Sequence, residues 1–175
     1  MADFEYVQWT DGTPILSDYL FKMSENDQHL KDLVDAMPQG VLGWAEDSDE
    51  DTTTSTNASL ITGMSVPVTV GENRLIRITY RQKSMKNSAD MTTLIGIFLN
   101  GAQLTSAIFT GKKEQNIGPQ EVWYVHSPAA GDHTYKVKGR IMNGGGGGNT
   151  ARFRATAVSP RQLIVEDLGE YVAPV

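Results

Sequence analysis

Short segments in which apolar and polar residues alternate fill the chain from Ser59 onward, with turn signals between them. The clearest covers residues 74–83, where Ile76, Ile78 and Tyr80 alternate with charged or polar residues. Successive side chains of a β-strand point to opposite faces, so this period of two predicts half-buried strands. The dipeptide Asn100-Gly101 is a strong signal for a two-residue hairpin turn.

A short strand is predicted at residues 41–45, and eight or nine follow from Ser59 onward, at residues 60–63, 66–70, 74–83, 91–99, 104–109, 121–127, 134–141, 152–157 and 162–166. Residues 91–99 are apolar on both faces, which indicates a central strand. Many short strands without a second helix are typical of an antiparallel β-sandwich of jelly-roll or related Greek-key type. We therefore predict a mainly β fold: a jelly-roll-like antiparallel β-sandwich at 41–175, preceded at 1–40 by an extended arm and one helix.

The one convincing helix pattern begins at Ser17, a good N-cap residue, and stops at Pro38 and Gly40. Apolar residues follow one another at steps of four and three, and only Asp27 interrupts the stripe; they are Leu16, Leu20, Met23, Leu30, Val34 and Met37. A stripe this narrow suits packing on one partner surface, copies of itself included. The alternatives are a helix that lies across its own β-domain and a helix that mediates assembly.

The first fourteen residues read as an extended arm that carries Phe4, Tyr6 and Trp9. Disordered tails are poor in aromatic residues, so we expect this arm to dock, either on its own domain or on a neighbouring subunit. Together with the helix stripe it forms the predicted assembly and attachment interface, whose residues are Phe4, Tyr6, Trp9, Leu16, Leu20, Met23, Leu30, Val34 and Met37.

Charge is divided unevenly along the chain. Residues 1–51 carry 13 acidic and 2 basic side chains, and residues 52–175 carry 8 acidic and 13 basic ones, for a net charge of −6. No apolar run approaches the length of about 20 residues that spans a membrane, and the N-terminus does not resemble a secretory signal. The absence of cysteine excludes disulfides and thiol catalysis. A soluble chain without a membrane partner is expected.

Motifs for catalysis or cofactors are missing from the sequence. The acidic residues of 46–58 fit no calcium loop, so we predict a solvated loop rather than a metal site. The glycine run at 143–149 lacks the Lys-Ser or Lys-Thr pair of a phosphate-binding loop, which favours a flexible loop. His29, His126 and His133 fall in no catalytic or metal motif, and are expected at the surface or in turns. We predict no enzyme activity, no cofactor and no metal.

Basic residues on several predicted strands would project toward one outer face; they are Arg77, Arg81, Lys136, Lys138, Arg140, Arg152 and Arg154. They form no nucleic-acid motif and are not interleaved with aromatic residues in the manner of a stacking platform. We predict no nucleic-acid partner.

The segment GTPILSDYLFKM resembles the GTPLTAADLNKM-type opening of many tailed-bacteriophage fibre and appendage proteins. The residues that match in kind are Gly12, Thr13, Pro14, Ile15, Ser17, Leu20, Lys22 and Met23, whereas Phe21 stands where that pattern has Asn. The later DAMPQGVLGWAE, the strand-rich body and QLIVEDLG resemble small phage virion proteins of the head decoration, head fibre and minor tail types. This resemblance implies a jelly-roll-like body, trimers and an N-terminal attachment element.

The prediction is therefore a non-enzymatic virion structural protein, made in the host cytoplasm. It would form a homotrimer and bind the major capsid protein on the capsid exterior as a decoration protein. The alternative is a tail appendage that binds a receptor or carbohydrate, in which loops 84–90 and 143–149 contact a host surface glycan. Surface aromatics in those loops would favour the alternative, and neither loop has one.

Overall fold

The computed structural model describes residues 17–143 and 149–171, with the side chains of 17–23 and 35 left undescribed. The chain divides between Pro38 and Gln39 into two compact units. Phe4, Tyr6, Trp9 and Leu16, like the rest of the predicted arm, lie outside the described residues. No helix in the described ranges is both long and apolar enough to cross a membrane.

The first unit contains helix α1, Ser17–Ala36, which begins where the predicted N-cap stands and ends one residue before the predicted end. The amide of Met37 donates to the carbonyl of Val34 at 3.2 Å and closes the last turn. Pro38 disfavours helical geometry at Met37, and Gly40 adopts a φ of 75°. The sequence signals for the end of the helix are therefore confirmed.

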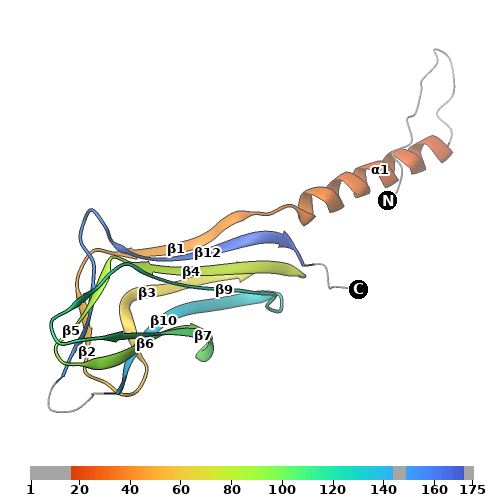
Figure 1. The fold of residues 1–175 in the computed structure, drawn as a ribbon. Helices are drawn as coiled ribbons and strands as arrows, with labels where there is room; N and C mark the ends of the chain where they lie inside the picture. The colour runs from red at the N-terminus through yellow and green to blue at the C-terminus, as the bar shows by residue number, and fades with distance from the viewer. Residues whose placement is uncertain (1–16, 144–148, 172–175) are drawn as a thin grey trace. The chain divides into compact units, whose positions relative to one another are not determined.

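Three antiparallel sheets of four strands make up the second unit (Figure 1). The first sheet has the order β1 (Gly40–Asp47), β12 (Arg161–Glu170), β4 (Arg74–Gln82) and β9 (Gln120–His126). The second has the order β3 (Ser59–Val70), β10 (Gly131–Asn143), β6 (Met91–Leu99) and β7 (Ala102–Gly111). The third, called the cap sheet here, has the order β2 (Asp51–Thr53), β11 (Ala151–Arg154), β5 (Ser84–Asn87) and β8 (Asn116–Ile117).

The order of the strands is that of a jelly roll. Every strand of the cap sheet lies in the connection between a strand of the first sheet and a strand of the second, so that β1, β2 and β3 follow one another through all three sheets. The same holds for β4 to β6, β7 to β9 and β10 to β12. The chain thus crosses repeatedly between two facing sheets, which confirms the predicted antiparallel β-sandwich.

The core fills the space between the first and second sheets. Alternate residues of the long strands point into it, among them Ile78 and Tyr80 of β4 and Ile95 and Ile97 of β6, all of them fully buried. Strand β6 pairs with β10 on one side and β7 on the other, as predicted for a central strand. Gly43 is needed where β1 meets β3, since a Cβ atom there would lie 2.7 Å from Val66.

Several predicted boundaries were wrong. The predicted strands at 60–63 and 66–70 are one strand, β3. Part of the predicted solvated loop at 46–58 is strand β2, and Thr53 in it is buried. Loop 84–90 contains strand β5, whose Met85 and Asn87 are fully buried, so this segment is no exposed contact loop. These strands of the cap sheet have few residues and are held by pairing with distant segments, which alternation cannot reveal.

Candidate interaction surfaces

Helix α1 presents an exposed apolar stripe. The exposed fractions of Leu30, Val34 and Met37 are 47%, 63% and 58%, and Leu33 beside them is 47% exposed. Residues spaced by three and four lie on one side of a helix, so Leu30, Leu33 and Val34 form a continuous surface, and Met37 follows directly after the end of α1. Leu20 and Met23 belong to the same helix, but their side chains are not described.

A second surface, with an exposed tryptophan at each end and the buried Thr79 between them, crosses the outer face of the first sheet. Trp44 pairs with Ile164, Ile164 with Thr79, and Thr79 with Trp123, so the four residues form one row across β1, β12, β4 and β9. Residues directly opposite one another in antiparallel strands point to the same face. The two tryptophans lie on the edge strands at either end of the row, and they are 62% and 60% exposed.

Charged pairs flank this tryptophan row on both sides, and the row that holds Arg77 and Glu166 also holds Val41 and Val125. On one side Arg81 contacts Glu121 at 2.6 Å, and Gln162 donates to Glu46 at 3.0 Å. On the other side Arg77 donates to both carboxylate oxygens of Glu166, at 2.9 and 3.0 Å. The Arg77 hydrogen bond lowers the pKa of Glu166. The tryptophan row is therefore framed by charged groups that are already paired with each other.

The sheet is hollowed beside Trp123. A shallow cleft of about 280 Å³ is lined there by Arg77, Thr79, Arg81, Glu121, Trp123, Val125 and Leu168. It combines an indole with two guanidinium groups and a carboxylate. Such a mixture suits a ligand that has both an apolar surface and hydrogen-bonding groups.

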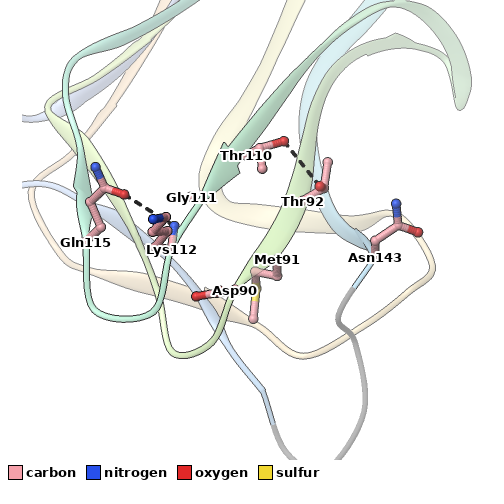
Figure 2. Close-up of a pocket in the computed structure, with 8 residues that line it drawn as sticks. All are labelled: Asp90, Met91, Thr92, Thr110, Gly111, Lys112, Gln115 and Asn143. Carbon is pink, nitrogen blue, oxygen red and sulfur yellow. Dashed lines mark hydrogen bonds between the residues drawn. The ribbon is translucent and has the colours of Figure 1, made fainter.

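A second cleft, of about 520 Å³, lies where β6 begins and β7 ends (Figure 2). Its walls include the hydroxyls of Thr92 and Thr110, which contact each other at 3.2 Å, and Gln115, which accepts from the amide of Lys112 at 3.4 Å. Asn143 also lines it and is followed directly by residues 144–148, which lie outside the described part of the chain. We assign no function to this cleft.

The basic residues do not share one face, contrary to the prediction. Arg77 and Arg81 lie on β4 of the first sheet, Lys136, Lys138 and Arg140 on β10 of the second, and Arg152 and Arg154 on β11 of the cap sheet. Arg77, Arg81 and Arg154 are paired with glutamates. The sheets divide these charges because strands adjacent in sequence belong to different layers.

Two of the predicted solvated carboxylates bind a buried arginine instead. Arg161 on β12 is fully buried, and its Nη2 atom lies 2.7 Å from Asp47 Oδ2, while Nη1 lies 3.9 Å from Asp51 Oδ2. Within the described ranges, no group of three or more His, Cys, Asp or Glu side chains is placed to hold a metal ion.

His126 is not a surface or turn residue, which corrects a further expectation. It lies on β9, partly buried, and its Nε2 atom is 2.8 Å from the hydroxyl of Tyr135. Burial raises the pKa of Tyr135 to about 12, so the phenol stays neutral. Burial also lowers the pKa of His126. A neutral histidine bonded to a neutral phenol is a structural contact in the sandwich.

No protein-family model matches this chain, and no curated protein matches it. Solved structures that are similar include the insecticidal delta-endotoxin Cry8Ea1 from Bacillus thuringiensis, at 10% identity and a TM-score of 0.43 over 67% of this chain. The match spans 19% of the toxin chain. The carbohydrate-binding module CBM36, solved with calcium and xylotriose, matches at 17% identity and a TM-score of 0.35, over 70% of this chain and 98% of the module. Eiger TNF from S. frugiperda matches at 11% identity and a TM-score of 0.40, over 78% and 98% of the two chains. At these values the similarity assigns no function.

Sequence reasoning missed the tryptophan row. Trp44 and Trp123 are separated by 79 positions in the sequence and come together only through the order of β1, β12, β4 and β9. A local signal for the orientation of Trp123 was present. Its neighbour Val122 on β9 is buried, and successive residues of a strand point to opposite faces. That alternation places Trp123 outward, but it does not show which residues lie beside it.

Proposed function

We propose that this chain is a non-enzymatic bacteriophage virion structural protein that forms homotrimers. Its N-terminal segment attaches it to the major capsid protein on the capsid exterior, and its β-sandwich is displayed outward. The observation that carries the proposal is the exposed stripe of Leu30, Leu33 and Val34 on α1, with the exposed Met37 directly after it, in a unit of its own.

Burial of this stripe on a partner is the main source of binding free energy in the proposal. Removing a Leu, Val or Met side chain from water stabilises by about 1.5–3 kcal/mol, so the four residues together supply enough to hold a helix on a partner. Glu25, Asp27 and Asp32 of the same helix are exposed, and their charge helps to keep the free chain in solution. The phage resemblance of the N-terminal segment supports the identity of the partner as a virion protein.

The absence of enzymatic activity belongs to the same proposal. The partly buried His126 is bound to Tyr135, and the buried carboxylate of Asp167 is bound to Arg74 at 2.9 Å. Groups that are held in this way stabilise the fold and are not free to transfer protons to a substrate.

The position of the protein on the particle tests the proposal. We would attach a tag to the C-terminus, label it with gold and image purified particles by electron microscopy. Label spread over the capsid surface is expected. Label confined to the tail tip would contradict the decoration role and favour a tail appendage.

A further inference from the structure

We propose that the outer face of the first sheet, from Trp44 to Trp123, is a binding site for a neutral oligosaccharide. The inference does not depend on the capsid attachment proposed above, because it concerns the displayed sandwich. It is carried by the tryptophan row, the charged pairs that flank it and the cleft beside Trp123.

The spacing of the row suits an extended ligand. Neighbouring strands lie about 4.8 Å apart, so the three steps from β1 to β9 place Trp44 and Trp123 about 14 Å from each other along the row. A single exposed aromatic residue is common on protein surfaces, whereas two in the same cross-strand row form a platform. The C–H faces of sugar rings stack on indoles, and a linear oligosaccharide would reach both.

The flanking charged pairs offer the hydrogen bonds that sugar hydroxyls need. Near the tryptophan row, Arg81 and Arg77 supply planar donor groups, and Glu121 and Glu166 supply planar acceptor groups. Each guanidinium keeps further N–H donors beyond those used in its ion pair. At the Trp123 end, the cleft of about 280 Å³ brings Arg77, Arg81 and Glu121 around the indole, which suits one sugar ring.

Charge and area favour this ligand over other occupants. The arginines are neutralised by their glutamate partners, so the face offers little attraction to an anionic polymer. Four strands and three rows cover on the order of 400 Å². A stable protein interface buries about 800 Å² on each partner, which is roughly twice this area.

The experiment measures binding by the whole chain to a panel of neutral oligosaccharides built from glucose, galactose, mannose or N-acetylglucosamine. We would use calorimetry on the wild type, Trp44→Ala and Trp123→Ala, with Ile108→Ala as a matched control. Ile108 is 58% exposed but lies on β7 of the second sheet. The wild type should bind at least one panel member with a Kd of about 0.1–1 mM, each tryptophan variant should lose about tenfold or more, and the control should bind unchanged.

A second measurement follows the indole N–H resonances of Trp44 and Trp123 in the wild type by NMR, so that the test does not rest on variants alone. Both resonances should shift on addition of the bound sugar. The proposal is overturned if no panel member binds at about 10 mM, or if sugar binds while both indole resonances stay fixed. It is also overturned if Trp44→Ala and Trp123→Ala dissociate an oligomer and no sugar binds, because the face would then be a protein interface.

Discussion

Arg161 is fully buried, and its Nη2 atom donates to the Oδ2 atom of Asp47 at 2.7 Å. The pair joins the start of β12 to the end of β1, where the chain passes between the first sheet and the cap sheet. Nη1 also lies 3.4 Å from the carbonyl of Phe153 in β11, whereas Nε has no partner. One buried cation thus ties the first sheet to the cap sheet.

Replacing Asp47 and replacing Arg161 should lower the free energy of unfolding by different amounts. Asp47→Asn leaves a buried guanidinium without its nearest counter-ion, so we expect a loss of about 3 kcal/mol in the free energy of unfolding. Arg161→Met fills similar volume without a charge and leaves Asp47 partly exposed to water, so its cost should be smaller, about 1 kcal/mol. Urea denaturation followed by circular dichroism measures both. A larger loss in Arg161→Met than in Asp47→Asn would contradict this account.

The second prediction concerns Gly139, which lies under the ring of Phe153. A Cβ atom at Gly139 would lie 2.3 Å from Phe153 Cζ, and Phe153 is 1% exposed, so the ring cannot move into solvent. We expect Gly139→Ala to lower the free energy of unfolding by about 1–3 kcal/mol.

The matched control for Gly139 is Gly118→Ala. A Cβ atom at Gly118 would have no neighbour within 4 Å. Urea denaturation should show little change in this control, and Phe153→Leu should recover part of the stability in the Gly139→Ala background. If Gly139→Ala were as stable as the wild type, Phe153 of the cap sheet would not be packed tightly against β10.

The third prediction is a pH dependence of stability that depends on His126. Burial, followed by the charge of His133, lowers the pKa of His126 from 6.5. The unfolded chain keeps the ordinary pKa and takes up the proton first as the pH falls. The stability that the neutral His126 contributes is therefore fully present above pH 6.5. It is lost as the pH falls from there toward the lowered pKa of His126 in the folded state.

Urea midpoints at about pH 7.5 and about pH 5.5 measure this effect. The wild type should lose stability between the two, and His126→Gln should lose less over the same interval. A variant that shows the same decrease as the wild type would assign the pH dependence to another group.

The parts of the fold that could be predicted are those with a local pattern. Strands such as β4 and β6 alternate or are apolar throughout, and the capped helix α1 has signals at both ends. Burial of Arg161 had no such signal, because the residue that neutralises it, Asp47, is 114 positions away. The tryptophan row and the cap sheet depend in the same way on strand order, which is set by long-range packing.

The fourth prediction concerns oligomeric state. A narrow apolar stripe stays exposed to water in a single chain of 19.1 kDa, whereas self-association would bury it. We therefore expect a homotrimer in solution. Light scattering at about 10–100 µM should give three times the monomer mass. A monomer mass over this whole range would contradict self-association through α1.

The last prediction tests the central claim, that α1 attaches the protein to the particle. Leu30→Asp and Val34→Asp together place two carboxylates on the exposed stripe, and burial of each unpaired charge costs several kcal/mol. The matched control is Ser24→Asp with Gln28→Asp, which adds the same charge at the same spacing on the other side of the helix.

The direct measurement is the binding of these variants to particles that lack the protein, with circular dichroism to confirm that the strand content is retained. The account predicts that the stripe variant is folded but loses binding by about a hundredfold or more, whereas the control variant binds like the wild type. A folded stripe variant that binds like the wild type would contradict attachment through this helix.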